Sequence, residues 1–212
     1  MLKTSVALIA AALTVCACSG SSSVLGPSAA SVAVQPGDLP SGMVKCDLTG
    51  DIDTFIKAEA SPDPATSKTL ADTWKDAKSK GATAGYTAVY TDSTEHCTGI
   101  KSTGSDIGAA TYKLVLNFVV QYKDEKSAAT GYTSDTTVGF RPSELKSGSA
   151  SFVEGTKTGL TANSITLTQP FEKQLFYIAV WQNKSFVVSL AVLNLDAAAA
   201  KNVATSENGR IK

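Results

Sequence analysis

The chain has 212 residues with 19 basic and 19 acidic side chains, so its formal net charge is zero at pH 7. Hydrophobic residues make up 43% of the sequence and charged residues 18%, which is typical of one globular domain with a sizeable core. The sequence contains no basic block and no basic stripe interleaved with aromatic residues, and this excludes nucleic acid as an expected partner.

The first 17 residues follow the order of a secretory signal peptide. Lys3 supplies a positive charge, residues 5–15 (SVALIAAALTV) form an uncharged apolar run, and small residues come next. The run is too short to span about 30 Å of hydrocarbon, which needs roughly 20 apolar residues. We therefore expect residues 1–17 to be a signal peptide and not a membrane anchor.

The cysteine pair at the end of this leader has a specific pattern. The stretch Val15-Cys16-Ala17-Cys18 resembles the lipobox of bacterial lipoproteins, with an aliphatic residue at −3, a small residue at −1 and then the invariant cysteine. If Cys16 were that cysteine, Val15 would stand at −1, where the family has Gly, Ala or Ser. Cleavage after Ala17 without lipid is the alternative.

The resemblance has consequences for location. It implies that Cys18 begins the mature chain and carries a thioether-linked diacylglycerol, often with a further acyl chain such as palmitate on its amino group. Two or three acyl chains hold a protein stably on a membrane. The expected location is the extracytoplasmic face of the cell membrane, and the membrane is an expected partner through this lipid.

Residues 18–42 look like a tether between that lipid and the domain. They are rich in Ser, Gly, Ala and Pro and contain a single charge, Asp38. Such a composition predicts a flexible coil, and about 20 residues of it would reach roughly 25 Å. The globular domain is then expected at residues 43–212.

Cys46 and Cys97 are the cysteines that remain in the mature chain. In an oxidising compartment they are expected to form a disulfide, with two free buried thiols as the alternative. The bond would close a loop of about 50 residues and stabilise the fold by roughly 4 kcal/mol in the chain-entropy model. His96 is the only histidine and lacks the spacing of a ligand set, so we expect no metal site.

Helix signals come first in the domain and strand signals dominate afterwards. A short helix is predicted after Cys46 in DLTGDIDTFIKAEA, and a clearer one over residues 65–80, where Leu70, Trp74 and Ala77 recur at helical spacing. Further elements follow in chain order: strands at 85–92 and 111–124, a helix after Asp124, a polar irregular stretch at 133–150, short strands at 150–155 and 163–169, a hairpin at 174–195, and a helix after Asp196.

This order predicts a single α+β domain, an antiparallel sheet with helices packed against it. The strand–helix step at 112–132 and the closing hairpin and helix at 174–208 resemble the PsbP-like fold. They also resemble the extracellular sensor-type domains of actinobacterial lipoproteins and kinases. The resemblance is one of element order, so it implies no functional residue.

Catalytic motifs are weak. Ser143-Glu-Leu-Lys146 and Lys157-Thr-Gly159 match the S-x-x-K and K-T-G strings of penicillin-recognising enzymes, but they stand close together without the S-x-N element between them. A serine triad would need His96, and no G-x-S-x-G is present. We therefore expect neither catalytic residues nor a cofactor.

The sequence thus predicts a non-catalytic binding, sensing or assembly module with a small-molecule or protein partner. A ligand is expected against the sheet or under the loop at 133–149, with Tyr177 and Trp181 as conceivable lining residues and core packing as their alternative role. The alternative function is a cell-envelope hydrolase whose site is scattered through the sequence.

Overall fold

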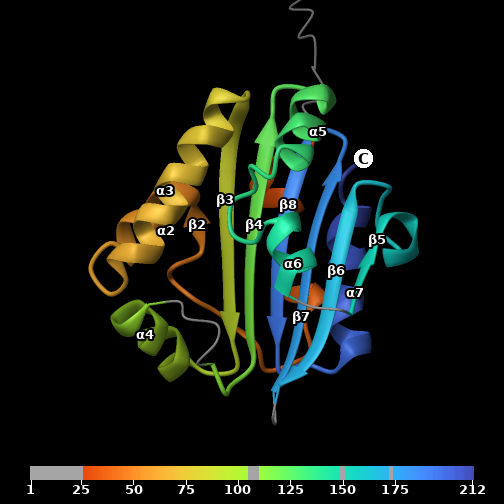
Figure 1. Cartoon of the computed structure of the whole chain (residues 1–212). Coiled ribbons are helices and arrows are strands. Elements are labelled where there is room, and N and C mark those ends of the chain that lie inside the picture. Colours follow the sequence, from red (N-terminus) through yellow and green to blue (C-terminus); the bar gives the residue numbers. More distant parts are fainter. Residues whose placement is uncertain (1–25, 105–109, 149–150, 172–173) are drawn as a thin grey trace, which may run out of the picture.

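The computed structural model describes residues 26–104, 110–148, 151–171 and 174–212. These residues form one antiparallel sheet with helices on both faces, which confirms the predicted single α+β domain (Figure 1). The sheet order is β1-β3-β4-β8-β7-β6-β5, and β2 also pairs with β3. The strands are β1 Val44–Lys45, β2 Gly50–Asp51, β3 Ala82–Thr91, β4 Leu114–Tyr122, β5 Phe152–Glu154, β6 Ser164–Phe171, β7 Gln174–Asn183 and β8 Phe186–Leu193.

The helices lie in two layers. Those of the described chain are α1 Ala29–Val32, α2 Ile52–Glu59, α3 Pro64–Ser79, α4 Thr94–Thr103, α5 Glu125–Thr133, α6 Pro142–Gly148 and α7 Ala197–Gly209, with 3₁₀ turns η1 Pro36–Asp38 and η3 Gly155–Thr158. We call the face covered by α2, α3, α5 and α6 the front face and the face covered by α1 and α7 the back face (Figure 1).

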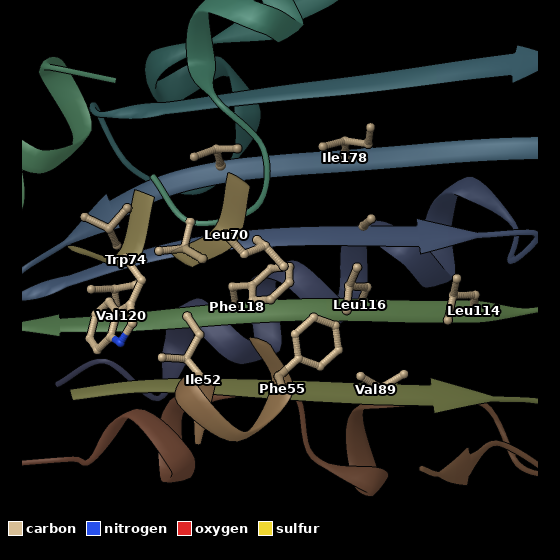
Figure 2. Close-up of a cluster of buried hydrophobic side chains, with 14 of the residues drawn as sticks. Ile52, Phe55, Leu70, Trp74, Val89, Leu114, Leu116, Phe118, Val120 and Ile178 are labelled. Atoms are coloured by element: carbon tan, nitrogen blue, oxygen red, sulfur yellow. The ribbon is translucent and has the colours of Figure 1, made fainter. Parts of the chain in front are cut away.

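Side-chain alternation along β4 creates a core on each face. Leu116 and Phe118 point to the front face, where they meet residues of α2 and α3 (Figure 2). Val115 and Val119 point to the back face, towards α1 and α7. Because successive strand residues point to opposite faces, a strand covered on both sides must be apolar at nearly every position. This explains why the sequence of β4 is apolar at most positions.

Two helices within residues 43–212 were not predicted. The stretch towards Cys97 is helix α4, which begins where the Ser93 hydroxyl accepts a hydrogen bond from the His96 backbone N–H (3.2 Å). The stretch 133–150, expected to be irregular, contains α6. The Asp135 carboxylate accepts a hydrogen bond from the Ser143 backbone N–H (3.0 Å) at the start of that helix. Each helix depends on a capping side chain outside its own apolar pattern.

The N-terminal segment also differs from expectation. The sequence predicts a tether up to residue 42, but residues 29–38 pack on the back face, and Val32 and Ala33 are fully buried there. The Arg210 guanidinium donates to the carbonyls of Val32 (3.1 Å) and Ala33 (3.0 Å) and pairs with Asp38 (2.7 Å). The folded domain therefore begins near Ser28, because a few small apolar side chains and these bonds offset the ordering entropy.

A buried polar cluster joins this segment to β4 and α7. The Asn117 side chain accepts a hydrogen bond from the Val34 backbone N–H (3.1 Å) and donates to the Glu207 carboxyl (3.2 Å) and the Ser189 carbonyl (3.4 Å). Burial raises the pKa of Glu207 well above its ordinary value, opposed by the Asn117 bond and the Arg210 charge. Its Oε1 has no hydrogen-bond partner among the described residues.

Glu207→Gln tests the raised pKa of this carboxyl. The folded chain keeps a proton that the unfolded chain releases near pH 4.5, so Glu207 lowers the free energy of unfolding as pH rises above that value, by up to about 1.4 kcal/mol per pH unit. The difference in free energy of unfolding between the glutamine variant and the wild type, measured by urea unfolding, should therefore be more favourable to the variant at pH 8 than at pH 5. An equal difference at both pH values would contradict the raised pKa, and the exposed Glu125→Gln serves as the control.

Arg210→Ala tests the attachment of the N-terminal segment. The loss of three bonds made by a partly buried guanidinium should cost about 2 kcal/mol of unfolding free energy. Subtilisin should then cut between residues 28 and 42 under native conditions, as detected by mass spectrometry. Arg141→Ala, which removes the exposed pair with Glu144, should cost under about 1 kcal/mol and leave the segment protected.

Candidate functional site

A groove of about 540 Å³ opens on the front face between α3 and the segment leading into α6. Figure 1 shows β4 exposed to view between these two helices, and Figure 2 shows Leu70, Leu116 and Phe118 together on the strand surface. These three apolar side chains form its floor. Its walls consist of Asp63, Ala65, Thr66, Thr69, Gly139, Phe140 and Glu144.

The wall formed by Gly139 and Phe140, in the segment leading into α6, is held directly on the sheet. Gly139 has φ +90°, and a Cβ at this position would lie 2.7 Å from Phe118 Cδ2 and 2.9 Å from Ser189 Oγ. The next residue, Phe140, donates its backbone N–H to that Ser189 hydroxyl (3.0 Å). Only glycine combines this backbone conformation with such a close approach. The groove therefore has a fixed wall, at a place where the sequence predicts a ligand, against the sheet and beside the 133–149 stretch.

Two carboxylates face the groove from opposite walls. Asp63 caps α3 and accepts the Thr66 backbone N–H (3.0 Å); hydrogen bonds from the Thr66 backbone and then from its hydroxyl lower the pKa of Asp63. Glu144 accepts the Arg141 backbone N–H (3.2 Å), and its Oε1 lies 3.7 Å from Arg141 Nε. Among the described residues that line the groove, none is basic.

A second cleft, of about 550 Å³, lies on the other side of α6. It is lined by Tyr132, Thr133, Asp135, Pro142, Ser143, Lys146, Glu154, Gly155, Ala162, Asn163 and Ser164. Ser143 and Lys146, the ends of the S-x-x-K string, both line it. However, the Ser143 hydroxyl donates to Asp135, and Lys146 pairs with Glu154 (2.6 Å). These contacts tie α6 to neighbouring segments.

The K-T-G string does not complete a catalytic pair. Thr158 is buried, its hydroxyl lies 2.7 Å from that of Ser164, and Gly159 ends the η3 turn with φ +83°. None of Lys157, Thr158 and Gly159 lines the second cleft. The two strings therefore do not face each other across a cleft as the penicillin-recognising chemistry requires.

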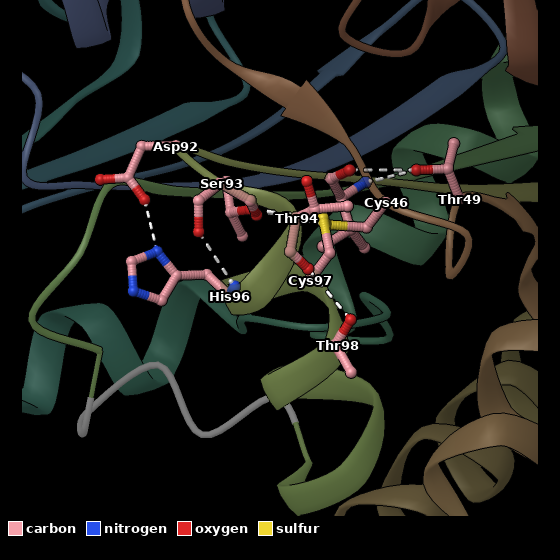
Figure 3. Close-up of a disulfide and its surroundings, with 10 residues drawn as sticks. Cys46, Thr49, Asp92, Ser93, Thr94, His96, Cys97 and Thr98 are labelled. Atoms are coloured by element: carbon pink, nitrogen blue, oxygen red, sulfur yellow. Dashed lines mark hydrogen bonds and ion pairs between the residues drawn. A yellow bond between two sulfur atoms is a disulfide. The ribbon is translucent and has the colours of Figure 1, made fainter.

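The predicted disulfide between Cys46 and Cys97 is confirmed, with the two Cα atoms 5.2 Å apart (Figure 3). It joins the segment between β1 and β2 to helix α4. His96 lies beside it, with Nδ1 2.6 Å from an Asp92 carboxylate oxygen and its ring stacked on Tyr112 at 4.0 Å between centroids. In the described part of the chain, no group of three or more potential metal-ligating side chains comes together.

Tyr177 and Trp181, which the sequence puts forward as lining residues, belong instead to the back-face core. Tyr177 is 4% exposed and Trp181 is fully buried, packed with residues of α7. Their positions on β7 have the parity that points away from the groove, whereas Ile178 and Val180 point to the front face. Both residues therefore have the alternative role that the sequence allows, core packing.

Cys18 and residues 1–17, predicted to be a signal peptide, lie outside the described residues. Within the described ranges, no helix has the length and apolar character needed to cross a membrane.

Comparison with known proteins gives only weak likeness. No family model matches the chain, and no curated protein matches it. Among solved structures, the extracellular domain of PknH from Mycobacterium tuberculosis is similar with a TM-score of 0.42 and 12% sequence identity. The similarity covers 62% of this chain and 66% of that chain, just under two thirds of its length. At these values the likeness carries no assignment of function.

Proposed function

We propose that the protein is a non-catalytic module, anchored by a lipid on Cys18 to the extracytoplasmic face of the cell membrane, that binds a small and largely apolar ligand. The observation that carries the binding proposal is the front-face groove. Its volume of about 540 Å³ lies within the roughly 300–1,000 Å³ of small-molecule sites. Its apolar floor and few polar wall groups are the usual composition of such sites.

The extracytoplasmic location has two supports. The lipobox-like stretch ending at Cys18 follows directly on an apolar leader. The Cys46–Cys97 disulfide is of the kind that persists in oxidising compartments and is rare in the cytosol. The two observations are independent, because one concerns the leader and the other the folded domain.

The non-catalytic part of the proposal follows from the second cleft. Its serine and lysine are both engaged, Ser143 by Asp135 and Lys146 by Glu154. An activated serine needs a neighbouring base that is free to take its proton, whereas the Lys146 amine lies 2.6 Å from the Glu154 carboxylate. The contacts therefore favour a role for these side chains in attaching α6 over a role in hydrolysis.

Cys18→Ser tests the anchor. Without the thiol that receives the lipid, the protein should move from the membrane fraction to the soluble extracytoplasmic fraction when it is expressed in a bacterium, and the mass of the lipid should be lost. Cys16→Ser is the matched control and should remain on the membrane with its lipid. Membrane retention of the Cys18→Ser protein would contradict the proposed anchor.

Thr69→Phe tests the groove. Thr69 is an exposed α3 residue on the groove wall, so a phenyl ring there should occupy the cavity and weaken binding of the neutral apolar dye N-phenyl-naphthylamine at least about tenfold. Binding is measured by dye fluorescence. Thr130→Phe on α5 is the matched control, since Thr130 is also exposed and also donates to a carbonyl one helical turn earlier. If the wild type does not bind the dye, or both variants behave alike, the groove is not the binding site.

A further inference from the structure

We infer that the groove selects amphiphiles whose polar end is an ammonium group, because its apolar floor lies between the carboxylates of Asp63 and Glu144. This inference rests on the proposed ligand-binding function and names the chemical class of its ligand. It follows from three features of the walls: the sign of their charge, the engagement of the nearby cations, and the direction of their hydrogen-bonding groups.

The charge of the walls is negative on both sides. Asp63 stands on the α3 wall and Glu144 on the α6 wall, and the floor contributed by β4 carries no charge. Hydrogen bonds from Thr66 lower the pKa of Asp63 and keep it ionised at neutral pH. A cationic head group would be attracted mainly by Asp63, because Glu144 already has Arg141 beside it, and an anionic head group would be repelled by Asp63.

Two of the cations on the elements that form the walls are already paired. Arg141 lies beside Glu144, at 3.7 Å from its carboxylate. On α3, Lys68 pairs with Asp72 at 2.5 Å on the exposed surface and does not line the groove. Asp63 forms no ion pair with any described residue. It is therefore the wall charge that a ligand cation would neutralise.

The hydroxyl donors of the α3 wall are used within α3 and its cap. The Thr69 hydroxyl donates to the Ala65 carbonyl (3.0 Å), and the Thr66 hydroxyl is used by Asp63. The Thr66 backbone N–H is also bound to Asp63, so this end of α3 has little to give an anion. The carboxylates of Asp63 and Glu144 offer acceptor oxygens at the groove. A primary ammonium, with three N–H donors, matches these acceptors better than a quaternary ammonium, which has none.

The test compares amphiphiles that share a decyl chain and differ at the head: decylamine, decyltrimethylammonium, decyl sulfate and the neutral decyl maltoside. Each is titrated below its micelle concentration in competition with N-phenyl-naphthylamine. Decylamine should bind at least about tenfold more tightly than decyl sulfate, with decyltrimethylammonium between them. The preference should shrink as salt is raised, because the groove is open to solvent.

Two isosteric neutralisations locate the effect. Asparagine caps a helix about as well as aspartate, so Asp63→Asn should keep α3 intact. Glu144→Gln keeps an oxygen that can accept the Arg141 N–H. The double variant should lose the preference for decylamine over decyl sulfate while it still binds the neutral dye. Asp124→Asn with Glu125→Gln makes the same changes at the start of α5 and should leave the preference unchanged.

The outcomes separate this inference from the proposed function. If the dye and decyl maltoside bind but decyl sulfate binds as tightly as decylamine, the inference is overturned and ligand binding stands. The same holds if the double variant keeps the preference of the wild type. If neither the dye nor any decyl compound binds, both fail together.

Discussion

Burial of β4 on both faces is the constraint on which the rest of the structure depends. Successive side chains of this strand point to opposite faces and both sets are apolar, so the fold needs one helical layer in front and another behind. The front layer comes from the middle of the chain, and the back layer from its two ends. The polar exception, Asn117, is fully buried, and its amide bonds both the N-terminal segment and α7. The segment at 29–38 and helix α7 are thereby both attached to the central strand β4.

The groove is a consequence of how incompletely the front layer covers that strand. α3 and α6 pack on either side of Leu116 and Phe118 and leave a strip of apolar floor between them. Closing the strip would need a larger side chain on the approach to α6, and the chain has glycine at 139, where the backbone lies against the Phe118 ring. The same close contact fixes the wall beside the floor residues Leu116 and Phe118, which are themselves largely buried.

Much of this fold could be predicted from local patterns. The apolar run of β4, the spacing of Leu70 and Trp74, and the confinement of two cysteines to one pairing are all short-range signals. The helices α4 and α6 could not be predicted in this way. Their apolar periodicity is weak, and the side chains that cap them, Ser93 and Asp135, lie outside the helices. The face of the sheet to which Tyr177 and Trp181 point could not be predicted either. Strand β7 is apolar on both faces, so the sequence does not show which alternate residues point to the front until the strand is paired with its neighbours.

The candidate site shows the same division. Asp63 could be recognised from sequence as a cap before Pro64, but nothing local connects it with Glu144, which stands about 80 positions later and reaches the groove only through the unpredicted α6. Ligand sites built from tertiary neighbours are hidden in this way. The residues that sequence reasoning favours for a site are large aromatics, and here the sheet needs them for packing.

The docking of residues 29–38 on the back face changes how the domain would relate to a bilayer. With a lipid on Cys18, only nine residues lie between the anchor and Ser28, and the ten residue steps from 18 to 28 could span at most about 35 Å. The domain would then sample a thin shell above the membrane. Molecules that partition into lipid headgroups are concentrated in that shell, so a groove suited to amphiphiles would meet them there at a local concentration far above that in bulk solution.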